Sequence, residues 1–230
     1  MTNLKIVEPV TIVTHLNPDF DALLSVWILR KFGGLDYANL EFVPVGKQLS
    51  SKNGEKLIHV DTGLSEFDNH KSGNEDKSSA ELVFEHLKIK SDLALKKLVD
   101  FSHRVDFGLL DNNEYSPYNV VAILSGLNQL HPDEPQRVAS IGFSILNSIY
   151  IKLQDEVLVF EELKKAIEFK TIWGNGLAIE TDNMATRSYA YRQGFKVFLS
   201  KSPSKGYVGF KAQGGSGVDF TTLYLKLTTL

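Results

Sequence analysis

The feature that most constrains this chain is a cluster of one imidazole and two carboxylates at a junction between an expected strand and an expected helix. The apolar, β-branched run Ile6 to Val13 predicts a strand, and Ala22 to Leu29 predicts a helix. His15, Asp19 and Asp21 therefore fall in or beside the turn between them. Carboxylates held close together and partly out of water repel each other unless a cation or a proton neutralises them. A divalent cation does so at neutral pH, so we expect a metal at this turn.

The composition limits both the class of protein and the ligands of such a metal. With 230 residues, 43% of them hydrophobic, the chain can form one large domain or two modest ones. It has no cysteine, so any metal must be bound by His, Asp, Glu or Asn. Imidazole combined with carboxylate oxygen suits Mn, Zn or Fe better than Ca.

The same composition gives an expectation about location. Lys5 and Glu8 interrupt the early apolar stretch, which is unlike a signal peptide. No run of about 18 consecutive apolar residues occurs in the sequence. We therefore expect a cytoplasmic protein without a membrane partner.

Charge is distributed unevenly along the chain. Residues 184 to 230 contain seven Lys or Arg residues and a single acid, Asp219, and are therefore +6; given the net charge of −3, residues 1 to 183 are −9. An acidic part that holds cations and a basic part that holds phosphates would suit a phosphorylated substrate. The alternative is that the basic segment is simply a solvated surface.

Strand-like and helical patterns alternate in the first part of the chain. Strands are expected at Lys5 to Thr14, Leu40 to Val45 and Lys56 to Val60, with a helix at Asp21 to Lys31. This order predicts a doubly wound, mostly parallel α/β domain with helices on both faces of its sheet. Further helices are expected at Ser78 to Leu87, Leu93 to Phe101, Asn119 to Leu130, Glu134 to Leu153 and Phe160 to Phe169.

The pattern changes near Trp173, and we place a domain boundary around residues 166 to 176. We predict a metal-binding catalytic domain over residues 1–170 and a small basic substrate-binding α+β domain over residues 171–230, which is short enough to need packing against the first. In the second domain, strands are expected at Leu177 to Glu180, Phe195 to Leu199 and Tyr207 to Lys211, a helix at Asn183 to Gln193, and a helix or strand at Phe220 to Leu227.

Asp61 stands at the carboxyl end of the expected strand Lys56 to Val60. Ligands gather at that edge of open parallel sheets, so Asp61 can meet His15, Asp19 and Asp21 in one crevice. The alternative is a turn residue that bonds the amide near Gly63.

Taken in order, four motifs resemble those of the DHH phosphoesterase superfamily: His15-x-x-x-Asp19-x-Asp21-Ala22, Asp61 at a strand end, Asp68-Asn69-His70, and an aspartate near position 106. For the fourth motif, Asp100 is an alternative to Asp106. The likeness covers roughly residues 8 to 110. The superfamily includes single-strand exonucleases, oligoribonucleases, cyclic dinucleotide phosphodiesterases, inorganic pyrophosphatases and exopolyphosphatases. Its fold is an α/β domain of parallel strands followed by a smaller substrate-binding domain. The resemblance implies a phosphohydrolase that uses a metal-activated water.

Carried over to this sequence, the resemblance implies that His15, Asp19, Asp61 and Asp106 surround one divalent ion, usually Mn. A second ion would be held by Asp21, Asp61 and Asp106. The family normally has a histidine ligand of this second ion where this chain has Asn69. An amide oxygen is a weaker ligand than imidazole for a transition ion, so one ion or two are both open, and Mg is an alternative to Mn.

The remaining predicted roles concern the substrate. Asp68 and His70 complete the family motif and are expected at the phosphate under attack, while Arg104 is expected to stabilise charge on phosphoryl oxygens. In the second domain, Gly214, Gly215, Ser216 and Gly217, flanked by Lys211, resemble the family's glycine-rich substrate loop. This loop can cradle a phosphate or form a plain hairpin turn, and both interpretations stay open.

Three functions follow as alternatives. The first is hydrolysis of a phosphodiester or phosphoanhydride bond in a nucleotide or short single-stranded nucleic acid. The second is an inorganic pyrophosphatase or exopolyphosphatase acting on a phosphorylated small molecule. The third is a nucleotide-binding module whose metal site is degraded, with Asn69 marking the loss. A homodimer is compatible with each of them.

Overall fold

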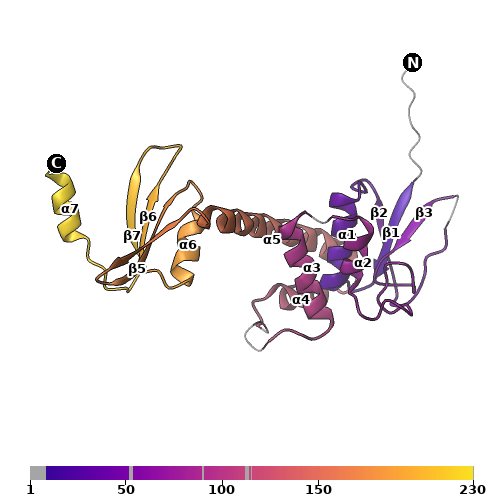
Figure 1. Cartoon of the computed structure of the whole chain (residues 1–230). Helices are drawn as coiled ribbons and strands as arrows, with labels where there is room; N and C mark the ends of the chain where they lie inside the picture. Colours follow the sequence, from indigo (N-terminus) through magenta and orange to yellow (C-terminus); the bar gives the residue numbers. More distant parts are fainter. Residues whose placement is uncertain (1–8, 52–53, 90, 112–113, 115, 230) are drawn as a thin grey trace, which may run out of the picture. The chain divides into compact units, whose positions relative to one another are not determined.

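The computed structural model describes residues 9–51, 54–89, 91–111, 114 and 116–229 (Figure 1). The first residues of the expected strand, 5 to 8, lie outside this described part. The chain divides into two compact units between Ile151 and Lys152. The elements, in order, are β1 (Val10–His15), α1 (Phe20–Phe32), β2 (Asn39–Val43), β3 (Lys56–His59), α2 (Ser79–His86), α3 (Leu93–Asp106), α4 (Val120–Leu130), α5 (Pro135–Leu163), β4 (Ile167–Thr171), β5 (Gly174–Glu180), α6 (Ala185–Arg192), β6 (Val197–Lys201), β7 (Val208–Ala212) and α7 (Thr221–Thr228).

The first unit contains a three-stranded parallel sheet in the order β2-β1-β3. All six residues of the central strand, β1, are buried. A central parallel strand is covered on both faces, which explains why its sequence is a nearly continuous β-branched run and not an alternating one. The sequence predicted these three strands, and the structure confirms that they are parallel.

Helix α1 lies in the core of the first unit. Every residue from Phe20 to Leu29 is buried, including Asp21 and Ser25. A helix that is apolar almost all round is buried on all sides, and α1 contacts β1, α2, α3 and α4. Asp19 caps its first turn, and the ring of Phe20 packs edge-on against Phe101 of α3, with ring centroids 5.2 Å apart.

Helices α2 and α3 begin at capping residues that the sequence signals. Ser78 and Glu81 form a reciprocal capping box at the start of α2, as the spacing of these two residues predicts. Helix α3 extends five residues beyond the predicted end at Phe101, to Asp106. It stops where Gly108 adopts a left-handed φ of 64°, which glycine adopts without a steric cost. The left-handed backbone at Gly108 therefore ends the helix.

One prediction in the middle of the chain is wrong. Two separate helices were expected at Glu134 to Leu153 and Phe160 to Phe169, but α5 is a single helix that ends at Leu163. The polar residues between the expected helices include no Gly or Pro, so nothing interrupts the helical hydrogen bonds. Residues from Ile167 onward form β4 instead, because their backbone pairs with β5.

The second unit contains a four-stranded mixed sheet in the order β4-β5-β6-β7. Strands β5 and β6 are parallel and joined by α6, while β4 and β7 are antiparallel to their neighbours. Its core comprises Leu177, Ile179, Ala190 and Phe198. Residues 221–228, expected as a helix or a strand, form α7. The glycine-rich segment therefore leads from a strand into a helix, and its interpretation as a hairpin turn is wrong.

Together the two units give a mixed α/β protein, with one parallel and one mixed sheet. Whether the first sheet is doubly wound, with helices on both faces, stays a prediction. The domain boundary predicted at residue 170 lies beyond the division between Ile151 and Lys152. Among the described residues, no helix has both the length and the apolar character needed to cross a bilayer.

We expect Ser78→Ala to lower the free energy of unfolding by about 1 kcal/mol. The variant loses the Oγ that accepts a hydrogen bond from the Glu81 amide at 3.3 Å. Urea denaturation followed by circular dichroism measures the change. Ser188→Ala, at an exposed position of α6, serves as the control and should change stability by less than about 0.5 kcal/mol. Equal losses in both variants would contradict a specific role for the cap.

Candidate metal centre

Two neighbouring parallel strands bring His15 and Asp61 to the same edge of the first sheet. β1 pairs with β3 in a register that places Val13 opposite His59. His15 and Asp61 each follow this pair by two residues, and Nε2 of His15 lies 3.1 Å from Oδ2 of Asp61. Each residue is only 8% exposed. The carboxyl-terminal edge of the sheet, where a ligand site is expected, therefore carries a buried imidazole and carboxylate in contact.

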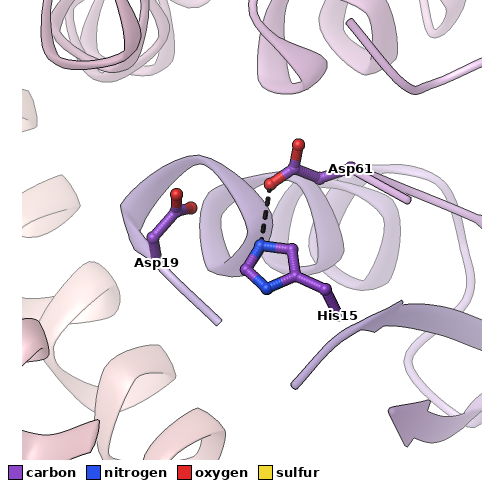
Figure 2. Close-up of side chains that lie close together, drawn as sticks. All are labelled: His15, Asp19 and Asp61. Carbon is purple, nitrogen blue, oxygen red and sulfur yellow. Dashed lines mark hydrogen bonds and ion pairs between the residues drawn. The ribbon is translucent and has the colours of Figure 1, made fainter. Parts of the chain in front are cut away.

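Asp19 approaches this pair from the start of α1 (Figure 2). The chain leaves β1 through Asn17, whose φ of 55° is left-handed, a conformation that asparagine tolerates better than most residues. Oδ1 of Asp19 then accepts a hydrogen bond from the Ala22 amide at 3.0 Å. One ligand atom from each of His15, Asp19 and Asp61 lies within 4.8 Å of the others. We call these three residues the His15 cluster.

The second ring nitrogen of His15 is held as in metal-ligating histidines. Nδ1 lies 2.8 Å from the carbonyl oxygen of Leu16. Because a carbonyl oxygen only accepts, Nδ1 carries a proton and donates it. Nε2, which faces Asp61, is then the nitrogen available to a cation. Metal-bound histidine commonly donates its other N–H to a carbonyl or carboxylate, which fixes the orientation of the ring.

Without a cation, protons must neutralise this cluster. Burial lowers the pKa of His15, but the hydrogen bond and the charge of Asp61 outweigh burial and raise that pKa to about 9. The pKa of Asp19 is raised as well, because surrounding protein atoms remove part of its hydration and because Asp61 is negatively charged. Part of the Asp19 residue is nevertheless exposed to solvent. The same two causes raise the pKa of Asp106 to about 6. The carboxylates of Asp19, Asp61 and Asp106 therefore lie close enough to disfavour one another's ionisation, which a divalent cation relieves.

Asp21 has a different environment from the His15 cluster. It is 2% exposed, and its oxygens accept hydrogen bonds from the amides of Ser79 at 2.7 Å and Ala80 at 3.1 Å and from Oγ of Ser102 at 2.7 Å. Burial and the neighbouring carboxylates raise its pKa to about 8. In the described structure Asp21 holds α2 and α3 against α1. Its role as a ligand of a second ion stays a prediction.

Asp61 also belongs to a second group of candidate ligands, with Asp68 and His70. Asp68 is 1% exposed, and its two oxygens accept hydrogen bonds from the amides of Leu64 at 2.6 Å and His70 at 3.0 Å. Nδ1 of His70 lies 3.2 Å from Oδ1 of Asp68, while 70% of the His70 side chain is exposed. Asp68 thus shapes the loop and orients the largely exposed imidazole of His70.

Asn69, where the resembling family has histidine, contacts the fourth predicted acid. Its Nδ2 donates to Oδ2 of Asp106, in the last turn of α3, at 2.6 Å. Its Oδ1 is buried and has no hydrogen-bond partner among the described residues. A buried acceptor without a partner costs about 1–3 kcal/mol. A cation bound by this oxygen would remove that cost, so the amide fits a metal ligand.

The predicted substrate-binding residues lie in both units. Arg104, in the first, forms a bidentate ion pair with Glu114, with Nη1 2.8 Å from Oε1, so a phosphate would have to displace that carboxylate. Lys211 is half-buried on β7 of the second unit. In the loop that follows, Gly214, Gly215 and Gly217 have open space around them. The His15 cluster itself is built from residues of the first unit alone.

Some polar groups at the site carry no sequence signal. Oγ of Ser79 donates to Oδ1 of Asp61 at 3.2 Å, and the hydroxyl of Ser102 binds a carboxylate on α1. Nδ1 of His103 lies 2.6 Å from Oε2 of Glu81. Glu81 lies on α2 and His103 on α3, so residue spacing does not show that these two side chains meet. Only packing reveals these contacts.

The donor set and its surroundings fit a divalent transition ion. One imidazole with several carboxylates suits Mn, Zn or Fe, and the orientation of His15 and the unpaired oxygen of Asn69 both agree with metal binding. A scan of protein-family models finds no match for this chain, and a search of curated proteins finds none either. A metal centre therefore stays a prediction, which the approach of His15, Asp19 and Asp61 supports.

We expect the metal-free protein to lose stability as the pH rises from about 6 to about 8.5. The pKa of His15 is raised from 6.5 to about 9, so its contribution is complete below the unfolded pKa and lost as the pH approaches 9. The pKa of Asp21, raised from 3.8 to about 8, acts in the same direction. At pH values between these two, the folded state keeps a proton that the unfolded state has released. Urea denaturation in EDTA should show a loss on the order of 2 kcal/mol from His15.

Saturating Mn²⁺ should reduce this pH dependence, because the cation replaces the proton on Nε2 of His15. His15→Gln should reduce it as well. A metal-free stability that is flat or rises over the same pH range would contradict the environment assigned to His15.

We expect Asp61→Asn to weaken Mn²⁺ binding at least about tenfold. Asp61 is the carboxylate that the two groups of candidate ligands share. Asparagine preserves the backbone, because position 61 has a left-handed φ of 52°, which Asn tolerates. Isothermal titration calorimetry measures affinity and the number of ions. Asp36→Asn, at an exposed position outside both groups, should bind Mn²⁺ like the unchanged protein, and equal affinities in all three proteins would contradict the site.

Proposed function

We propose that the chain is a metal-dependent phosphohydrolase of the DHH type that cleaves a phosphodiester or phosphoanhydride bond. The observation that carries this proposal is the approach of His15, Asp19 and Asp61 to within 4.8 Å of one another at the carboxyl-terminal edge of a parallel sheet. An α/β protein with no chemical role for these side chains would not need to bury an imidazole and a carboxylate together at a cost of several kcal/mol per ion.

The proposal includes the finer predictions from the sequence. Residues 1–170 would form a doubly wound catalytic domain, and residues 171–230 would bind substrate. The substrate is a nucleotide or a short single-stranded nucleic acid. Mn²⁺ is the favoured ion and Mg²⁺ the alternative, held by His15, Asp19, Asp61 and Asp106, with Asn69 as a further ligand. A divalent ion in this position supplies Lewis-acid stabilisation of phosphoryl charge and acidifies a water molecule.

His70 is the residue best placed to handle a proton. Its Nδ1 donates to the Asp68 carboxylate, which fixes the tautomer, and its exposed side chain leaves Nε2 accessible to substrate. In its protonated form Nε2 can donate to a leaving oxygen, and in its neutral form it can accept from an attacking water. Asp68, which is buried and fully hydrogen-bonded, is a positioning residue for this imidazole.

A specific observation favours the nucleotide-binding module as the second candidate. The oxygens of Asp21 and Asp68 already accept protein hydrogen bonds. Arg104 is paired with Glu114. The hydrogen bonds leave Asp21 and Asp68 fewer free lone pairs for a second ion, and the ion pair leaves Arg104 less free to bind phosphoryl oxygens. A centre with one ion could hold a nucleotide without cleaving it.

We expect the protein, with Mn²⁺, to hydrolyse bis-p-nitrophenyl phosphate and short RNA. Asp61→Asn should lower turnover at least about 100-fold, because it removes a ligand carboxylate. His70→Ala should lower turnover by about 100-fold while weakening Mn²⁺ binding far less than Asp61→Asn does, as expected for a proton-transfer residue. Release of nitrophenol and of mononucleotides measures both.

The controls separate the alternatives. Asp36→Asn should retain full activity. Hydrolysis of pyrophosphate without hydrolysis of RNA would identify the pyrophosphatase alternative. Tight nucleotide binding without turnover would identify the binding module. Turnover unchanged in Asp61→Asn would reject the proposed catalytic centre.

A further inference from the structure

The second unit has a cavity of its own, at the carboxyl ends of two parallel strands. Strand β5, helix α6 and strand β6 form a β-α-β unit, with β5 and β6 paired in parallel. Parallel strands joined in this way commonly bind ligands beyond their carboxyl ends, beside the start of the connecting helix. The cavity opens at this place, and among its lining residues are Thr181, Arg187, Ser200, Lys205, Tyr207 and Lys211.

The volume of the cavity, about 80 Å³, restricts what it can hold. A buried water needs roughly 10–15 Å³ by this measure, so about five to eight waters would fill it. Pockets that enclose a whole drug-sized molecule measure about 300–1,000 Å³. The cavity therefore suits a small polar group, such as the terminal group of a larger molecule, and not an entire nucleotide.

The charge of the lining favours an anion. Arg187, Lys205 and Lys211 line the cavity, and no described acidic side chain forms an ion pair with any of them. The one acid in the lining, Asp182, is held by the hydroxyl of Ser202 and by the Ser204 amide at 3.2 Å. These hydrogen bonds, together with the charge of Lys205, lower the pKa of Asp182. The lining thus carries three cations against one anion that is already engaged.

The strand register places two of the donors, Ser200 and Lys211, on the same face of the sheet. In the pairing of β6 with β7, Lys211 is opposite Phe198 and Gly209 is opposite Ser200, so these residues share one face of the sheet. A Cβ built on Gly209 would lie 3.8 Å from Oγ of Ser200, 3.8 Å from Cε2 of Tyr207 and 4.0 Å from Cε of Lys211. A larger side chain at position 209 would therefore contact three of the residues that line the cavity.

We propose that this cavity binds a phosphate group, through Arg187, Lys211 and the Ser200 hydroxyl. A phosphate dianion matches the surplus of positive charge, and its tetrahedral oxygens can accept from cations and a hydroxyl that come from different elements. The site lies entirely within the second unit and does not involve the His15 cluster. It also lies outside the glycine-rich loop at Gly214 to Gly217.

The test is a titration of the isotope-labelled full chain with inorganic phosphate in EDTA, followed by NMR at constant ionic strength. We expect saturable shifts of the amides around Ser200 and Lys211. Lys211→Gln and Arg187→Gln should each weaken phosphate binding about tenfold, because a charge-assisted hydrogen bond is lost. Gly209→Val should weaken it at least as much without changing any charge, because the new side chain occupies the space.

The matched control is Lys170→Gln, which removes the same charge from an exposed position on β4 of the same sheet and should bind phosphate normally. Phenyl phosphate should bind as inorganic phosphate does, because the cavity takes only the phosphoryl end. Equal shifts with chloride or acetate, or full affinity in Lys211→Gln, would overturn the proposal.

This experiment is independent of the proposed hydrolase. Asp61→Asn should retain phosphate binding in the second unit even where it abolishes turnover. Phosphate binding without hydrolysis of any substrate would leave this inference standing and reject the enzyme. Hydrolysis of a substrate, without phosphate-induced shifts of the amides near Ser200, would support the enzyme and reject this inference.

Discussion

The parallel pairing of β1 with β3 is the constraint on which the candidate centre depends. It fixes Val13 opposite His59 and so brings His15 and Asp61 into contact two residues later. Backbone hydrogen bonds along the sheet hold this register whatever the charge state of the two side chains. The sheet can therefore impose a contact that the side chains, being desolvated, would not maintain by themselves.

The two units collect opposite charge at similar places in their folds. In the first, Asp61 lies beyond the end of β3, and its charge helps to raise the pKa values of Asp19 and Asp106. In the second, Arg187, Lys205 and Lys211 gather beyond β5 and β6. Strand ends leave side chains without sheet partners, so either charge can be concentrated there.

Local signals in the sequence predicted the starts of helices better than their ends. Ser78 with Glu81 marks the start of α2 because the residues that satisfy the first amides are close in sequence. The end of α5 depends on non-local pairing: the residues after Leu163 form β4 because β5 lies beside them. Intrinsic propensity distinguishes helix from strand weakly, and a neighbouring strand can outweigh it.

The sequence by itself determined which chemistry is available: one early imidazole, acids at strand ends, no thiol, and a basic C-terminal segment. Only the tertiary structure decided the partner of each group. It turns Asp21 toward Ser79 and Ser102, 58 and 81 residues away in sequence, and leaves His15, Asp19 and Asp61 facing one another. The physical reason is that side-chain contacts depend on strand register and helix packing, which residue spacing along one segment does not specify.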